Sequence, residues 1–159
     1  MIKSFAKLAK EKQDVKYVVC GTGERFNKIK KLAEKLGVLD RIKFLGYRTD
    51  IDKIMQVSDI FYHQSFHEGL TMSVIEAMHF GLPVVVSNVR GNRDLIDKIG
   101  GFVTNSKDVD KQTEALIYLL ENPNKCKDMG EYNMRKATKY YIDVVREQLK
   151  DIYQQIGIL

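Results

Sequence analysis

The chain has 159 residues, of which 44% are hydrophobic and 30% charged, a composition typical of one soluble globular domain with a single core. No run approaches the roughly 18 apolar residues of a membrane span, and the N-terminus lacks the apolar core of a signal peptide, so we expect a cytoplasmic protein. The net charge of +5 comes from lysines interleaved with acidic residues, so the sequence does not support nucleic-acid binding and allows at most peripheral contact with the inner face of the membrane.

Strand-like and helix-like segments alternate along the chain. The spacing of apolar residues predicts helices over 3–12, 24–36, 50–57, 71–80, 92–98, 108–121, 124–139 and 141–156. Short apolar runs predict strands over 15–20, 42–45, 59–63, 84–86 and 101–104. Gly37 and Gly81 each follow the last periodic residue of a helix, and Pro83 stands just beyond the second of them, so helix termination explains Gly81-Leu82-Pro83 without any chemistry.

The order of these elements predicts the fold class. Strands that are apolar throughout, separated by helices, are typical of a parallel sheet with helices on both faces, so we expect an α/β, doubly wound, Rossmann-like fold. Residues 1–159 should form a single domain that ends in the helix 141–156. Ligands in such folds bind outside the carboxyl ends of the strands.

The segment from Ser65 to Met78 carries the strongest functional signal. It joins a predicted strand to a predicted helix, with Glu68 before the helix and Glu76 within it. Unpaired amides at a helix start bind phosphate or polyol oxygens, and the two carboxylates can accept hydrogen bonds from sugar hydroxyls. The segment therefore suits a ligand that is part phosphate and part sugar. Because Glu76 stands among apolar residues, we expect it to be partly buried, with a ligand hydroxyl or a backbone amide as its partner.

Two further glycine segments remain open to more than one interpretation. Gly21-Thr22-Gly23 follows a strand and opens a helix, which fits a phosphate-binding turn or an ordinary tight turn; the dinucleotide and P-loop motifs are both absent. In Arg90–Asp94, Gly91 could allow a ligand to approach closely, and Asn92 could cap the next helix or contact a ligand.

The histidines and cysteines do not predict a metal centre or a nucleophile. His63, His67 and His79 have no partner cysteines or close acidic spacing, so we expect no metal site. Cys20 and Cys126 lie far apart and are expected to be free thiols. No Ser/His/Asp elbow or Cys/His pair is visible.

Several of these motifs, in this order, resemble the retaining group 1 glycosyltransferases of the GT-B fold, which include enzymes of capsule, exopolysaccharide and lipopolysaccharide synthesis. The resemblance covers roughly residues 5–140. The matching segments are Val18–Gly23, Arg41–Gly46, Glu68–Leu70, Val74–Met78, Gly81–Val85 and Ser87–Asn92. The two glutamates at Glu68 and Glu76 are its most specific part.

The resemblance implies a role for each matching residue in binding a nucleotide diphosphate sugar, without a cofactor or a metal. Glu68 would contact the transferred sugar and act as the catalytic residue. Gly69, Leu70 and Thr71 would offer backbone N–H groups, and Glu76 would bind the ribose. Gly21 and Gly23 would let the backbone pass close to the nucleotide, while Phe44 and Tyr47 would line the base pocket.

The chain departs from the family pattern at its start. The family's first strand in this domain, the arginine and lysine that clamp the diphosphate, and the N-terminal acceptor domain have no counterpart, so the resemblance implies the C-terminal half of a GT-B fold lacking its first strand. That strand would lie between the strands at 15–20 and 59–63, so either these two strands close up or something else fills the gap between them.

These observations leave three hypotheses for the chain. It is the donor-binding half of a glycosyltransferase, inactive alone; a non-catalytic nucleotide-sugar-binding module or partner subunit; or a structural domain without a ligand. The apolar stripe of the helix 141–156 packs on its own domain or meets a partner, which could be the acceptor domain, another chain or a second copy in a homodimer.

Overall fold

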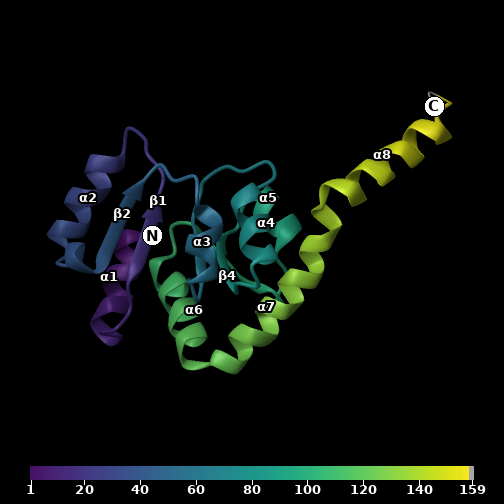
Figure 1. The fold of residues 1–159 in the computed structure, drawn as a ribbon. Coiled ribbons are helices and arrows are strands. Elements are labelled where there is room, and N and C mark those ends of the chain that lie inside the picture. The colour runs from purple at the N-terminus through teal and green to yellow at the C-terminus, as the bar shows by residue number, and fades with distance from the viewer. Residues whose placement is uncertain (158–159) are drawn as a thin grey trace.

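The structure, a computed structural model, describes residues 1–157 (Figure 1). Its strands are β1 Tyr17–Cys20, β2 Ile42–Gly46, β3 Phe61–His63, β4 Val84–Ser87 and β5 Gly101–Thr104. Its α-helices are α1 Ile2–Glu11, α2 Phe26–Lys35, α3 Ile51–Gln56, α4 Met72–His79, α5 Arg90–Leu95, α6 Val109–Glu121, α7 Pro123–Ala137 and α8 Ile142–Gln155. The α/β class predicted from the sequence is confirmed, since strands and helices alternate as expected.

All the strand pairs are parallel, but within residues 1–157 the strands form two sheets instead of one. The first sheet pairs β1 with β2, and the second has the order β3-β4-β5. β1 and β3 therefore do not close up on each other. A groove of about 630 Å³ lies between them, lined by Tyr17 and Val18 on one side, Ile60 and Tyr62 on the other, and apolar side chains of α1 and α6.

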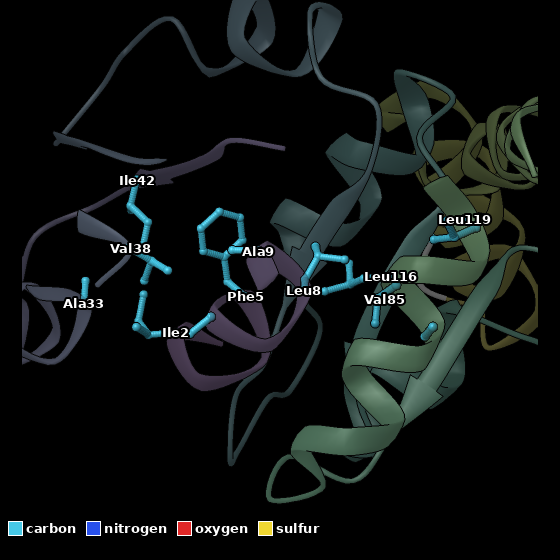
Figure 2. Packing of buried hydrophobic residues seen from close by; sticks show 12 residues of the cluster. Ile2, Phe5, Leu8, Ala9, Ala33, Val38, Ile42, Val85, Leu116 and Leu119 are labelled. Carbon is cyan, nitrogen blue, oxygen red and sulfur yellow. The ribbon is translucent and has the colours of Figure 1, made fainter. Parts of the chain in front are cut away.

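Helices cover both faces of the strands, and β4 lies at the centre of the arrangement. The side chain of Val85 joins one buried cluster together with α1, α2 and α6. Those of Val84 and Val86 point to the opposite face and join a second cluster with α3, α4 and α5. Figure 2 shows the first cluster, which runs from Ile42 on β2 through α1 to Leu119 on α6. The alternation follows from the pleat of a strand and gives the two-layered covering that the apolar strands predicted.

The helix ends agree with the glycine signals, but one helix begins earlier than expected. Gly37 and Gly81 have φ values of +69° and +68°, the left-handed conformation that ends a helix. The helix predicted over 92–98 begins at Arg90 and ends at Leu95, with Val89 as its N-cap residue. Asn92 is therefore inside α5, and the prediction that it caps the helix is wrong.

The C-terminal helix α8 extends away from the rest of the molecule (Figure 1). None of its residues is buried, and most of its apolar side chains are exposed, including Ile142, Leu149 and Ile152. The interpretation that this stripe packs on its own domain is therefore wrong. No helix within residues 1–157 has the length and apolar character needed to cross a membrane.

Asp97, which follows α5, ties that part of the chain to α7. Its carboxylate accepts hydrogen bonds from Tyr132 Oη at 2.6 Å and Lys136 Nζ at 2.7 Å, and from the amides of Ile99 and Gly100. Partial burial alone would raise the pKa of Asp97, but these donors outweigh burial and hold its pKa well below the usual range.

We expect Asp97→Asn to lower the free energy of unfolding near pH 7, and this deficit to shrink as the pH falls below about 4. Because the native pKa is lower than the unfolded one, the stabilisation is present above the unfolded pKa and disappears on acidification. Urea unfolding at pH 7, 4 and 3 measures it. Asp151→Asn, on exposed α8, is the control; a deficit that is the same at every pH contradicts the prediction.

Candidate functional site

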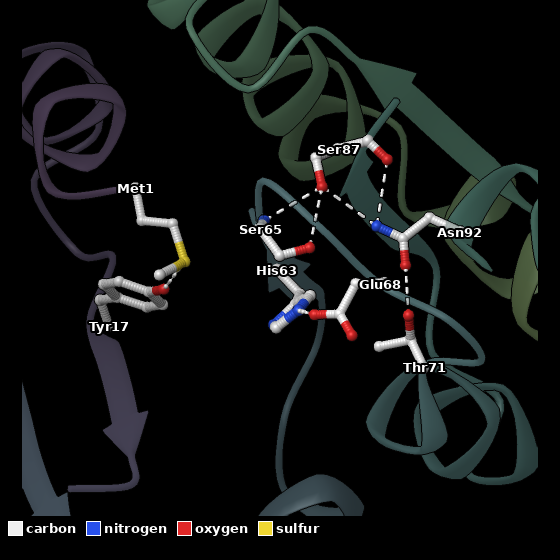
Figure 3. Close-up of polar contacts among 8 residues, drawn as sticks. All are labelled: Met1, Tyr17, His63, Ser65, Glu68, Thr71, Ser87 and Asn92. Atoms are coloured by element: carbon white, nitrogen blue, oxygen red, sulfur yellow. Dashed lines mark hydrogen bonds and ion pairs between the residues drawn. The ribbon is translucent and has the colours of Figure 1, made fainter. Parts of the chain in front are cut away.

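The loop of residues 64–71 joins β3 to α4 at the carboxyl end of the second sheet. Thr71 is the N-cap residue of α4, but its side chain makes no capping hydrogen bond. Its hydroxyl instead donates to Asn92 Oδ1 at 2.7 Å (Figure 3). Since the first amides of a helix have no intrahelical acceptor, the start of α4 presents N–H groups and the positive end of the helix dipole to a ligand.

A buried polar network holds this loop against β4 and α5. Ser87 Oγ accepts hydrogen bonds from the Ser65 amide at 3.0 Å and from Asn92 Nδ2 at 3.1 Å, and Asn92 Nδ2 also donates to the Ser87 carbonyl at 3.0 Å. Ser87 and Asn92 are fully buried, and Thr71 nearly so. Asn92, which the sequence left as a helix cap or a ligand contact, is a structural part of the site that connects the loop to α5 (Figure 3).

The backbone of the same loop packs directly on Gly91. A Cβ atom added at this glycine would stand 2.3 Å from the carbonyl oxygen of Gly69, which is too close for any side chain. The sequence predicted that Gly91 could admit a ligand. The close approach is instead that of the protein's own loop, so the glycine sets the position of Gly69.

Glu68 lies on this loop and is half buried. Its Oε1 atom is 3.1 Å from Nε2 of His63, the last residue of β3. Together with Gly69, Arg90 and Arg93 it lines a cavity of about 520 Å³. A carboxylate with two guanidinium groups and exposed backbone is suited to a ligand that carries both hydroxyl groups and negative charge.

Glu76 lies within α4, and its side chain is exposed. The expectation that it is partly buried is therefore wrong. The apolar residues beside it in the sequence face the core, while Glu76 faces outward between them on the helix. It lines a second cavity, of about 500 Å³, together with Tyr47, Arg48 and Phe80. The structure thus brings Glu76 and Tyr47 together, but Glu68 lines a different cavity.

Arg48 stands at this second cavity in a defined orientation. Its Nε and Nη2 atoms donate to the two carboxylate oxygens of Asp50 at 2.7 and 2.6 Å. These hydrogen bonds lower the pKa of Asp50 and raise that of Arg48. The pair places a planar cationic group at the edge of the cavity that Tyr47 and Glu76 line.

Three of the remaining predicted residues, Gly21, Gly23 and Phe44, lie at or near the carboxyl end of the first sheet. Gly21 and Gly23 have φ values of +122° and +152°, which favour glycine, and a Cβ on either would meet open space. Phe44 is on β2, where its ring meets that of Phe26 with centroids 5.6 Å apart, and it lines neither of the two cavities just described. Leu70 is exposed at the end of the loop.

Sequence reasoning gave no ligand-binding role to four side chains of the site: His63, Arg48, Arg90 and Arg93. Arg48 and Arg90 lie in the segments Gly46–Arg48 and Asn88–Asn92, which their position at strand ends had marked as candidates for the site. Arg93 was considered only as a neighbour of Asn92. His63 was weighed only as a metal ligand. Within residues 1–157, no group of three or more His, Cys, Asp and Glu side chains is arranged to hold a metal ion.

The chain is similar to known glycosyltransferases. The sequence matches the family described as "Glycosyl transferases group 1" over residues 1–136. It is 31% identical over 144 residues to the UDP-Gal:alpha-D-GlcNAc-diphosphoundecaprenol alpha-1,3-galactosyltransferase of Escherichia coli, covering 88% of this chain and 37% of that protein. It is 29% identical over 154 residues to the putative glycosyltransferase EpsD of Bacillus subtilis, covering 96% of this chain and 40% of that protein.

Solved structures give the same result. HepE of Anabaena, in complex with UDP-glucose, superposes with a TM-score of 0.85 at 25% identity, over 99% of this chain and 44% of that one. WaaG, a glycosyltransferase involved in lipopolysaccharide biosynthesis, superposes with a TM-score of 0.82 at 25% identity, over 95% of this chain and 41% of that one. The chain spans less than half the length of these relatives. Because the family model matches residues 1–136, most of its length, the chain belongs to the group 1 glycosyl transferases.

Proposed function

We propose that this chain is the donor-binding half of a glycosyltransferase that moves a sugar, with retention, from a nucleotide diphosphate sugar to a polysaccharide or glycolipid acceptor. The observation that carries the proposal is the start of α4: Glu68, on the loop before it, lines one cavity, and Glu76, within the helix, lines another. The named relatives include a galactosyltransferase that uses UDP-galactose and a structure that binds UDP-glucose.

The two cavities suggest how the ligand would divide between them. Tyr47 and Glu76 would take the base and ribose, because an aromatic ring and an exposed carboxylate suit those groups. The backbone N–H groups of Gly69, Leu70 and Thr71 would receive the diphosphate at the helix start. The hydroxyl of Thr71 is engaged with Asn92, so its contribution would come from its amide.

Glu68 would bind hydroxyl groups of the transferred sugar and is the residue we place closest to the reaction. The dipole of α4 and the guanidinium groups of Arg90 and Arg93 would stabilise the negative charge that develops on the leaving diphosphate. Gly21 and Gly23 would let the nucleotide lie close to the backbone. Phe44, on β2, would help to form the side of the site that receives the base. We propose that the reaction needs no metal ion or other cofactor.

The acceptor would be bound by a further domain or chain. The chain spans less than half of its relatives, and we place the contact with an acceptor-binding domain on the exposed apolar stripe of α8. The chain alone would then bind the donor without transferring the sugar. Such an assembly would work in the cytoplasm, at or near the membrane.

Calorimetric titration of the full chain with UDP, GDP, UDP-glucose, UDP-galactose and GDP-mannose tests the donor site. We expect at least one sugar nucleotide to bind. The double variant Arg90→Ala/Arg93→Ala should bind it about 10-fold or more weakly, because two cations near the diphosphate are lost. Lys28→Ala/Lys31→Ala, at two exposed positions of α2, is the matched control. A wild-type chain that binds none of these nucleotides contradicts the proposal.

A further inference from the structure

The contact between His63 and Glu68 joins the end of a strand to the carboxylate of the loop. Nε2 of His63 lies 3.1 Å from Oε1 of Glu68, and the two side chains retain 30% and 26% of their exposure. The imidazole also stacks on Phe61, with centroids 6.1 Å apart and an interplanar angle of 18°. The ring is therefore held by the strand that carries it.

This contact matters because Glu68 has no regular secondary structure around it. A glutamate side chain has about 1.5–2 kcal/mol of rotamer entropy to lose when it is ordered. A hydrogen bond from a ring already fixed on β3 orders the carboxylate before any ligand arrives. Because a carboxylate only accepts hydrogen bonds, His63 Nε2 is the donor.

The arrangement leaves half of the carboxylate free. Figure 3 shows one oxygen of Glu68 meeting the His63 ring and the other pointing away from it. The free oxygen belongs to a side chain that lines the cavity with Arg90 and Arg93. One oxygen is thus occupied by the protein, and the other can accept a hydrogen bond from a ligand hydroxyl.

We propose that His63 is a positioning residue that sets Glu68 for the sugar part of the ligand. The inference rests on the proposed function and adds that the sugar and the nucleotide are recognised by different residues. His63 acts on recognition of the sugar, while the nucleotide part of the ligand is bound by the second cavity, which His63 does not line.

The test compares binding of UDP with binding of UDP-glucose, UDP-galactose and UDP-N-acetylglucosamine. We expect His63→Ala to lower the affinity for the sugar nucleotide that the wild type binds most tightly by about 5- to 20-fold, because one ordering hydrogen bond is lost. The affinity for UDP should stay within about 2-fold of the wild type. His63→Gln, whose side-chain amide can donate in place of Nε2, should restore most of the loss. The corresponding GDP and GDP-mannose pair is used if the wild type prefers GDP.

Two further variants complete the experiment. Glu68→Gln should reproduce the selective loss of affinity for the sugar nucleotide. The double variant His63→Ala/Glu68→Gln should add little to this loss, because both changes disrupt the same His63–Glu68 pair. His79→Ala is the control, since its ring contacts Tyr141 and not the loop. Thermal unfolding of each variant verifies that it is folded.

The outcomes separate the two proposals. A wild-type chain that binds neither nucleotides nor sugar nucleotides contradicts the proposed function and this inference with it. If the wild type binds a sugar nucleotide, the positioning role is overturned by any of three results: unchanged affinity in His63→Ala, equal weakening of UDP and the sugar nucleotide, or no recovery in His63→Gln.

Discussion

Asn92→Leu should lower the free energy of unfolding by about 3–5 kcal/mol, since it removes the partner of several buried polar groups at once. Leucine has the same branched arrangement of side-chain heavy atoms as asparagine, but its methyl groups cannot accept the hydrogen bond from Thr71 or donate to Ser87. The Thr71 hydroxyl would then be buried without its acceptor, and Ser87 would lose the two hydrogen bonds that Asn92 donates to it. Chemical unfolding followed by circular dichroism measures the change.

The same variant should also loosen the loop that carries Glu68. Asn92 connects this loop to α5 through Thr71, so any protein that still folds should bind a sugar nucleotide more weakly than the wild type. Asn124→Leu, at an exposed position near the start of α7, is the matched control and should change the unfolding free energy by less than about 0.5 kcal/mol. If Asn92→Leu is as stable as this control, the network does not hold the loop.

Glu76→Ala should lower the affinity for the nucleotide by about 10- to 100-fold, because hydrogen bonds to a charged group are lost. The affinities for UDP and for UDP-glucose should fall by the same factor, since this carboxylate lines the cavity that we assign to the base and ribose. The side chain is exposed, so the unfolding free energy should stay within about 0.5 kcal/mol of the wild type. Titration calorimetry with both ligands, together with thermal unfolding, measures these effects.

Glu34→Ala provides the control for Glu76, because it removes an equally exposed glutamate from α2 and leaves the two cavities untouched. It should bind both ligands as the wild type does. Unchanged binding of UDP in Glu76→Ala would mean that the second cavity is not the nucleoside site. Selective weakening of UDP-glucose would instead place Glu76 beside the sugar.

The patterns in the sequence predicted the elements more reliably than the surroundings of single side chains. Gly37 and Gly81 ended helices as expected, because their signal is a local backbone conformation. Glu76 was misjudged because its neighbours in the chain are apolar, whereas a helix turns successive side chains to different faces. Asn92 was misjudged because the start of α5 moved by two residues, which turned an expected cap into a buried network residue.

The sequence by itself determined the α/β class, the parallel strands, the ends of the main helices and the segment with the two glutamates, because these depend on local periodicity and turn chemistry. Only the tertiary structure decided that the strands form two sheets, that Glu68 and Glu76 line separate cavities, and that His63 meets Glu68. Those features depend on the path of the loops and on how strands distant in the chain pack together. Hydrophobic patterning does not encode either of them.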